Sequence, residues 1–234
     1  MINDAIDIQD ARERLQRDGR VQVGSYLQEQ AAERLWHCLA QEVPWTLALR
    51  DAGGARTISH AKYLAMQAEA RASLLRDVAD SAIGGGYRFA YESYMMVSAY
   101  KERRDPGLLL HGVLELFNSA PYIGFVQALT GDTGIRRVNA QATRYQAGHF
   151  LRYHTDIDNQ EGRRYAYVLN LSRRWHADWG GLLQFIGADG GVVETYLPRW
   201  NSLSVFKVPA GHAVSMVAPW ADTDRLAITG WFLS

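Results

Sequence analysis

Two histidines and one aspartate in the C-terminal half have the residue types and the spacing of a metal site. His154 and Asp156 lie two residues apart in the run YHTD, and His212 follows 56 residues after Asp156. If YHTD lies in a β-strand, alternation directs the side chains of His154 and Asp156 to the same face. Two imidazoles and one carboxylate on one side of an ion leave positions open for a cosubstrate and oxygen, which suits non-haem Fe(II) better than zinc. The sequence therefore predicts a metal site at His154, Asp156 and His212.

A single arginine near the C-terminus is the candidate partner for an anionic cosubstrate. Arg225 opens the run RLAITGW, 13 residues after His212. In a strand, Arg225 and Thr229 share one face. The charges of Fe(II), one aspartate, one arginine and a bound dicarboxylate cancel, and a guanidinium pairs with a carboxylate through two parallel hydrogen bonds. We expect Arg225 to bind a two-carboxylate cosubstrate, with phenolic hydrogen bonds from Tyr145 and Tyr167 on nearby strands.

The remaining histidines are expected to be structural or exposed. His149 lies five residues before His154, so strand alternation points it to the opposite face, although it is also a candidate for the pocket entrance. His176 falls in the polar turn 172–180. Three further histidines fall in segments with helical patterns, namely His37, His60 and His111.

The elements that must position these residues are short β-rich runs separated by turn residues. Eight such runs are expected at 138–145, 150–157, 164–171, 182–186, 192–197, 203–207, 213–217 and 226–233. Eight strands in fewer than 100 residues, with no long helix between them, predict an antiparallel double sheet of the jelly-roll kind. In a jelly roll the second and seventh strands can be neighbours, which would bring His212 to His154 and Asp156.

The N-terminal half is expected to be mainly helical. Helices are predicted at 7–18, 28–41, 59–81, 108–118 and 121–130, strands at 45–49 and 87–100, and an exposed charged loop at 101–107. The predicted fold class is α+β, a cupin-like double-stranded β-helix with the N-terminal helices packed on one sheet. Residues 1–234 are expected to form one domain, in which 1–137 supports a core at 138–234.

Composition narrows the classes of function. The 25 basic and 25 acidic side chains cancel and the sequence pI is about 7.1, so no broad positive field favours nucleic-acid binding. One cysteine, Cys38, allows neither an intrachain disulfide nor a cysteine-based zinc or iron–sulfur site. No apolar stretch approaches the roughly 20 residues that cross a bilayer, and 1–20 has no signal-peptide core. These features favour a cytoplasmic protein without a membrane partner.

The ordered motifs of the C-terminal segment resemble the Fe(II)/2-oxoglutarate dioxygenases, particularly the prolyl hydroxylases. The resemblance covers roughly the last 95 residues and is carried by Tyr145, the run HTD at 154–156, YVLN at 167–170, GGLL at 180–183, His212 and the run 225–231. It is most similar to single-domain bacterial relatives of the ribosomal-protein and hypoxia-sensing prolyl hydroxylases. The resemblance implies that His154, Asp156 and His212 bind Fe(II), that Arg225 pairs with the distal carboxylate of 2-oxoglutarate, and that Tyr145, Tyr167 and Thr229 assist.

The same resemblance implies a reaction and a partner. Oxygen and 2-oxoglutarate would be consumed and succinate and CO2 released, with ascorbate as a stimulant, while a prolyl C–H bond in a protein or peptide is hydroxylated. A translation protein is one candidate partner, and residues 100–119 would correspond to a mobile loop that covers the substrate.

Three alternatives stay open. The same chemistry could act on a free amino acid or small metabolite. A non-enzymatic cupin-like binding module would require loss of a metal ligand or of Arg225, and the sequence retains all of them. Demethylation of nucleic acid is disfavoured by the neutral charge. The sequence does not determine the oligomeric state.

Overall fold

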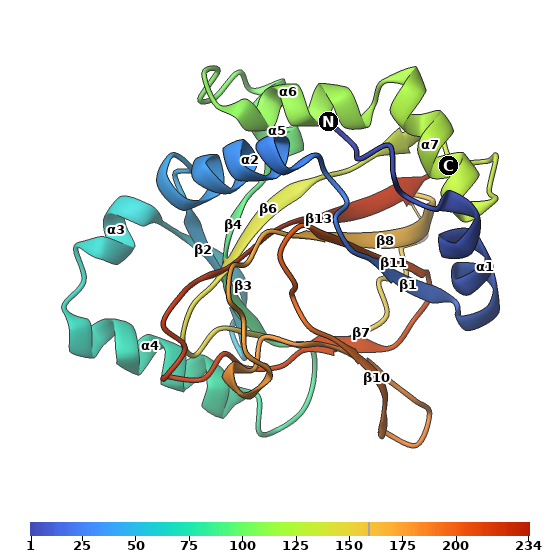
Figure 1. The fold of residues 1–234 in the computed structure, drawn as a ribbon. Helices are drawn as coiled ribbons and strands as arrows, with labels where there is room; N and C mark the ends of the chain where they lie inside the picture. The colour runs from blue at the N-terminus through green and yellow to red at the C-terminus, as the bar shows by residue number, and fades with distance from the viewer. Residues whose placement is uncertain (159) are drawn as a thin grey trace.

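The computed structural model describes residues 1–158 and 160–234 (Figure 1). The helices are α1 Ile8–Asp18, α2 Glu29–Gln41, α3 His60–Leu64, α4 Ala68–Ser81, α5 Met96–Lys101, α6 Leu109–Phe117 and α7 Ala120–Thr130, with a 3-10 turn at Ala177–Trp179. The strands are β1 Arg20–Val23, β2 Thr46–Asp51, β3 Gly54–Ser59, β4 Phe89–Tyr94, β5 Arg137–Val138, β6 Gln141–Tyr145, β7 Phe150–His154, β8 Arg163–Asn170, β9 Leu183–Ile186, β10 Val192–Tyr196, β11 Ser202–Lys207, β12 His212–Val214 and β13 Arg225–Leu233.

The strands form an antiparallel sheet that curls into a nearly closed barrel, the double-stranded β-helix that the sequence predicts (Figure 1). The strand order is β1-β11-β8-β13-β6-β4-β7-β12-β9-β10. Outside this order, β2 pairs with β4 and with β3, and β5 pairs with β13. The strand that begins at His212, β12, pairs with β7, which ends at His154. The neighbouring second and seventh strands on which the predicted metal site depends are therefore present.

The strand prediction for the C-terminal segment is confirmed, with one subdivision. All eight predicted runs contain a strand, and the first is divided into β5 and β6 by two residues, Asn139 and Ala140. The alternation of apolar and turn residues thus located the strands of the barrel.

The N-terminal half departs from the prediction at several places, and strands β1 and β3 were not predicted. The predicted strand 87–100 is only β4, followed by helix α5, because Met96 and Ala99 bury their side chains at helical spacing against the core. Burial of that face overrides the β-favouring composition. The predicted helix 59–81 is divided into α3 and α4 at 65–67.

Capping residues explain the helices whose bounds were predicted well. Asp7 accepts a hydrogen bond from the backbone N–H of Asp10 at the start of α1, and Gly19 ends the helix at a φ of 71°. In the same way, the side chain of Ser119 caps the start of α7 and the left-handed Gly131 ends it. These local signals depend on neighbours in the sequence, which is why they can be read without the tertiary fold.

Helices cover the barrel on two sides. The larger core packs α1, α2, α6 and α7 onto the outer face of the sheet that contains β8, β11 and β13, as predicted. Helix α4 packs elsewhere: its Val78 lies with Leu47, Leu49, Ala90 and Phe150 on the outer face of β2, β4 and β7. None of the helices in the described part of the chain is both long and apolar enough to cross a membrane.

A close approach of two backbone segments makes Gly230 sensitive to substitution. Gly230 is buried in β13 opposite Tyr167, and a Cβ there would collide with the carbonyl oxygen of Asn139. We expect Gly230→Ala to lower the free energy of unfolding by about 1–3 kcal/mol, the usual cost of overpacking. Gly112→Ala in α6, where a Cβ meets nothing within 4 Å, is the matched control and is expected to be stabilising. Urea unfolding of both variants measures the difference, and equal stabilities would contradict the expectation.

Candidate functional site

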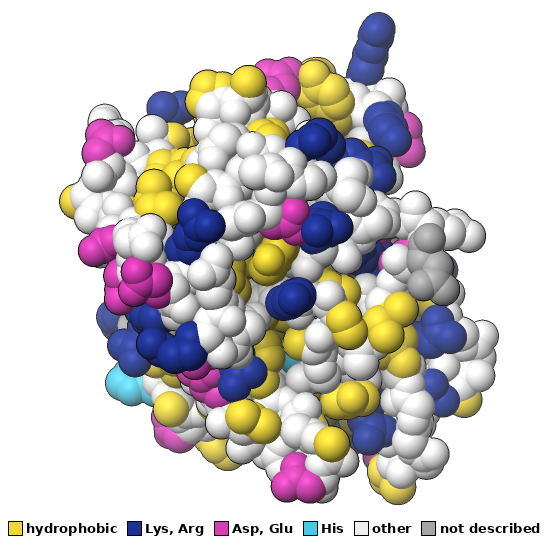
Figure 2. All heavy atoms as spheres, turned by 90° about the vertical axis from the view of Figure 1, so that its right-hand side faces the viewer, with side chains coloured by type: hydrophobic (Ala, Val, Ile, Leu, Met, Phe, Trp, Pro, Cys, Tyr) yellow, Lys and Arg dark blue, Asp and Glu magenta, His cyan; other side chains and the backbone are white. Residues whose placement is uncertain are grey.

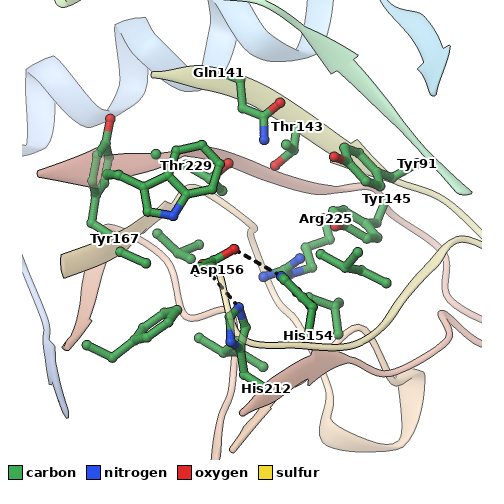
Figure 3. A pocket seen from close by; sticks show the side chains of 18 of the residues that line it. Tyr91, Gln141, Thr143, Tyr145, His154, Asp156, Tyr167, His212, Arg225 and Thr229 are labelled. Carbon is green, nitrogen blue, oxygen red and sulfur yellow. Dashed lines mark ion pairs between the residues drawn. The ribbon is translucent and has the colours of Figure 1, made fainter. Parts of the chain in front are cut away.

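The structure brings the three predicted metal ligands together at one point. His154 and His212 are direct cross-strand partners, and their ring centroids are 4.1 Å apart. Nε2 of His154 lies 3.3 Å from Oδ1 of Asp156, and Nε2 of His212 lies 3.5 Å from Oδ2 of the same carboxylate (Figure 3). One ligand atom from each residue lies within 4.8 Å of the others. The cluster has the dimensions of a site for one ion.

Asp156 reaches this cluster in a way that the sequence did not predict. Strand β7 ends at His154, so alternation along a strand does not place Asp156 beside it. Instead the backbone of Asp156 has a φ of 59°, in the left-handed region that aspartate adopts more readily than most residues. The structure places Asp156 beside the two histidines, but by a left-handed turn and not by the strand alternation that was expected.

Both histidines are oriented by main-chain carbonyls. Nδ1 of His154 lies 2.9 Å from the carbonyl oxygen of Arg152, and Nδ1 of His212 lies 2.8 Å from that of Ala210. If each Nδ1 carries the proton and donates to its carbonyl, the lone pair of each Nε2 faces Asp156. This arrangement of a second hydrogen bond behind the ligand atom is typical of metal-binding histidines.

The electrostatics of the cluster favour the protonation states that bind metals. Burial, with the neighbouring His154, lowers the pKa of His212 to about 4. Burial alone would raise the pKa of Asp156, but the hydrogen bond from His154 and the charges of both histidines outweigh it, so the pKa is lowered. At neutral pH the cluster therefore consists of a carboxylate beside a neutral His212. Its donor set fits a divalent first-row metal such as Fe(II).

Two neighbouring strands, β6 and β13, supply another wall of the same pocket. Along β13 and β6 two pairs of direct cross-strand partners line it, Arg225 with Tyr145 and Thr229 with Gln141, and Thr143 lines it between them. Figure 3 shows Gln141 and Thr143 across the cavity from His212. Gln141 and Thr143 were missed from the sequence, although they alternate with Tyr145 and share its face.

Arg225 is a buried cation that has no anionic partner among the described residues. The residue is 2% exposed, forms no ion pair with any described residue, and its Nε atom has no hydrogen-bond partner there. Its guanidinium carbon lies 4.9 Å from the centre of the Tyr145 ring, and Tyr145 stacks on Tyr91. A buried charge without a partner is costly, so this end of the pocket is suited to a bound carboxylate. Arg225, Tyr145 and Thr229 all line the pocket, as the sequence analysis required.

Tyr167 occupies a different place from the one expected. Its ring lines the pocket, but its hydroxyl donates to the carbonyl oxygen of Asn139 at 2.9 Å and points away from the cluster (Figure 3). The ring also stacks on Phe232 within the larger core. Because its only proton is already donated, the expected phenolic hydrogen bond from Tyr167 to a cosubstrate is not supported.

Tyr167→Phe tests whether the Tyr167 hydroxyl takes part in binding the cosubstrate. We expect the affinity for 2-oxoglutarate to stay within about twofold, because the hydroxyl does not face the pocket. The free energy of unfolding should fall by about 1–3 kcal/mol, because a buried carbonyl oxygen loses its donor. Ligand titration and urea unfolding measure the two quantities, and a large loss of affinity without loss of stability would restore the original assignment.

The other histidines lie outside the pocket. His149 is 1% exposed, its Nδ1 accepts a hydrogen bond from the backbone N–H of Gln146, and burial lowers its pKa to about 4. It is structural and is not at the entrance. His176 is exposed in its turn, as predicted. Three more lie in helices and do not line this pocket, namely His37, His60 and His111.

The mouth of the pocket is bordered by a residue that sequence reasoning missed. Tyr87 follows the triple glycine 84–86, and its ring lies 5.3 Å from that of His154 while remaining 39% exposed. Residues 100–119, expected to be a mobile cover, contribute no residue to the pocket lining. They consist of the end of α5, a turn and α6, whose Leu110 and Phe117 are buried in the core. An aromatic residue directly after a glycine-rich run was the available signal for Tyr87.

Sequence comparison identifies the segment that carries the site. Residues 140–233 match the family model of the 2OG-Fe(II) oxygenase superfamily. The chain is 40% identical over 82 residues to Prolyl 3-hydroxylase OGFOD1 of Xenopus laevis, covering 32% of this chain and 16% of that protein. It is 33% identical over 127 residues to Prolyl 3,4-dihydroxylase OGFOD1 of Ostreococcus tauri, covering 49% of this chain and 24% of that protein. The matched segment thus spans a quarter or less of these curated relatives.

Solved structures show the same fold along most of the chain. A prolyl-4-hydroxylase from Pseudomonas putida superimposes with a TM-score of 0.59 at 19% identity, covering 97% of this chain and 98% of that one. A Trichoplax adhaerens prolyl hydroxylase, solved with a peptide fragment of the hypoxia inducible factor oxygen degradation domain, gives a TM-score of 0.55 at 16% identity, covering 97% and 88%. At these identities the likeness concerns the fold, which is the double-stranded β-helix described above.

Proposed function

We propose that this chain, whose residues 140–233 belong to the 2OG-Fe(II) oxygenase superfamily, is an Fe(II)- and 2-oxoglutarate-dependent dioxygenase that hydroxylates a prolyl residue of a protein or peptide. One observation carries the proposal: the cluster of His154, Asp156 and His212 lines the same pocket as the buried Arg225, which forms no ion pair with any described residue. The cluster suits a metal, and the arginine suits the far carboxylate of a dicarboxylic acid.

The residues of the chain then have distinct parts in the reaction. His154, Asp156 and His212 would hold Fe(II), which with 2-oxoglutarate and O2 supplies oxidation of an unactivated C–H bond, with release of succinate and CO2. Arg225 would bind the distal carboxylate of 2-oxoglutarate. Burial raises the pKa of Tyr145 well above its usual value, so the phenol keeps its proton and can donate to the same carboxylate. Thr229, which lines the same wall, could contribute its hydroxyl.

The surface around the pocket supports a polypeptide substrate. Tyr87 at the mouth is 39% exposed, and Ile157, directly after Asp156, is 62% exposed. Figure 2 shows a face of the molecule that is hollowed near its centre, with hydrophobic side chains in the hollow and Lys and Arg side chains around it. Exposed apolar side chains beside the metal cluster suit a chain segment better than a small polar amino acid. The named prolyl hydroxylases among the relatives support proline as the residue.

The first test is an anaerobic titration of the purified protein with Fe(II) and then 2-oxoglutarate. A visible charge-transfer band that requires both components is expected, because a chelated 2-oxo acid on Fe(II) absorbs there. Absence of the band in protein that has bound iron would contradict the proposal and favour a cupin-like binding module.

The second test concerns the substrate. Succinate release in the presence of proline-containing peptides, starting with segments of translation proteins, should rise above the level without peptide, and the peptide should gain the mass of one oxygen atom on proline. Stimulation by free amino acids alone would instead indicate the small-metabolite alternative. We include in this proposal a cytoplasmic location, which rests on the single cysteine.

A further inference from the structure

We propose that Arg163 and Trp231 form a positioning unit that holds Asp156 in the metal cluster. The inference rests on the proposed metal site and adds two residues that have no part in the ligand set. Neither residue is needed to explain the three ligands themselves, so the unit can be tested separately from them.

Asp156 is the one member of the cluster that strand pairing does not hold. His154 and His212 end or begin paired strands and face each other across β7 and β12. Asp156 lies beyond the end of β7, with a left-handed φ of 59°. Its carboxylate can stay beside the two imidazoles only if other contacts hold this turn, because such a backbone conformation is disfavoured for residues with a Cβ.

Arg163 makes those contacts from the first residue of β8. Its Nη1 lies 3.4 Å from the backbone carbonyl oxygen of Asp156. Its Nη2 lies 2.8 Å from a carboxylate oxygen of Glu161 and 3.7 Å from one of Asp158. One guanidinium therefore connects three residues of the turn between β7 and β8.

The same guanidinium is fixed to β13 by stacking. Its carbon atom lies 3.7 Å from the centre of the Trp231 indole, which is close for a cation over an aromatic ring. A planar guanidinium can place its face on a ring while its edge donates hydrogen bonds, which an ammonium group cannot do. The turn that carries Asp156 is thereby attached to the strand that carries Arg225.

The side chain of Trp231 carries a buried donor on the wall of the pocket that Asp156 also lines. Its Nε1 is buried and has no close hydrogen-bond acceptor among the described residues, although the ring lines the pocket. A buried donor that lacks a close acceptor and lines the same pocket as a metal ligand is suited to orient it, as hydrogen bonds behind ligands commonly do.

Two conservative variants test the unit, and the chain offers a matched control for each. Trp231→Phe keeps an aromatic ring against Arg163 and removes the indole N–H. Arg163→Lys keeps the positive charge and removes the planar guanidinium group. Trp200 is likewise a tryptophan stacked by an arginine: its Nε1 donates to Glu29 at 2.9 Å, and the guanidinium carbon of Arg173 lies 4.9 Å from its ring centre. Trp200 does not line the pocket. Trp200→Phe and Arg173→Lys are therefore the same changes made away from the cluster.

Cobalt(II) serves as the probe, because its visible spectrum reports the geometry of the ligands. Trp231→Phe and Arg163→Lys should each weaken Co(II) binding by roughly 10- to 100-fold, the range for partners behind a metal ligand. Both should also alter the visible spectrum, whereas both control variants should match the wild-type protein. Wild-type affinity and spectrum in both test variants, with folding verified by circular dichroism, would overturn the inference.

Hydrogen exchange of the metal-free protein gives a readout that does not depend on the metal. Arg163→Lys should accelerate amide exchange at 155–158, and Arg173→Lys should leave it unchanged. If Arg163→Lys fails to fold, Glu161→Gln removes the exposed partner of Arg163 and should shift exchange in the same direction. Unchanged amide exchange at 155–158 in the folded variants would refute the role of Arg163 in holding this turn. Failure of the wild-type protein to bind any metal would refute the proposed function, and with it the purpose of the unit.

Discussion

Replacing His212 with alanine is expected to abolish 2-oxoglutarate turnover while leaving the barrel folded. The residue supplies one of three ligands, and even partners behind a ligand account for about 10- to 100-fold in metal affinity, so the loss of Fe(II) affinity should exceed 100-fold. His212 sits beside Phe206, with ring centroids 4.7 Å apart, and its removal leaves a small cavity in an otherwise intact sheet. Metal titration and succinate release measure the effect.

The control for this variant is His176→Ala. His176 is exposed in a turn and does not line the pocket, so metal affinity and turnover should both equal those of the wild-type protein. Thermal unfolding of His212→Ala without metal separates loss of a ligand from loss of the fold. Normal turnover by a folded His212→Ala protein would be incompatible with the proposed metal site.

Replacing Arg225 with alanine is expected to weaken 2-oxoglutarate binding without affecting the metal. Truncation of one partner in a buried, hydrogen-bonded charge pair costs about 2–5 kcal/mol, so the dissociation constant should rise by more than about 30-fold. Fe(II) affinity should stay near that of the wild-type protein, because Arg225 belongs to the opposite wall of the pocket. Titration of the charge-transfer band with 2-oxoglutarate measures the change.

A second ligand makes this experiment specific for the distal carboxylate. A monocarboxylic 2-oxo acid of similar size has no distal carboxylate, so it should bind the wild-type protein weakly and lose little further affinity in Arg225→Ala. Arg225→Lys should restore part of the binding of 2-oxoglutarate, since it returns the charge but not the two parallel donors. Equal losses for both ligands would show that Arg225 acts through the shape of the pocket and not through charge.

Local signals account for the parts of the fold that were predicted correctly. The caps Asp7 and Gly19 define α1, and alternation of apolar residues defines the strands from 138 onward, because both depend on residues close in sequence. Helix α5 was missed because burial of Met96 and Ala99 against distant helices decides its conformation. A composition rich in β-favouring residues carries no information on that burial.

The site residues also differ in how far their positions could be predicted from the sequence. The residue types and order of His154, Asp156, His212 and Arg225 predicted a metal pocket with an anion partner, and the pairing of β7 with β12 brings the ligands together. The direction of the Tyr167 hydroxyl could not be read from strand position, because its acceptor is a carbonyl 28 residues away in the sequence. Its role as a donor to the cosubstrate therefore finds no support in the structure.

The sequence by itself determined which side chains are available for chemistry and on which strands most of them lie, since alternation and turn residues are local properties. Only the tertiary structure decided that a left-handed turn brings Asp156 to the histidines, that Tyr87 borders the mouth, and that Arg163 stacks on Trp231. These contacts join segments far apart in the chain or depend on a single unusual backbone angle. Their geometry is set by the closure of the barrel as a whole, which no short stretch of sequence specifies.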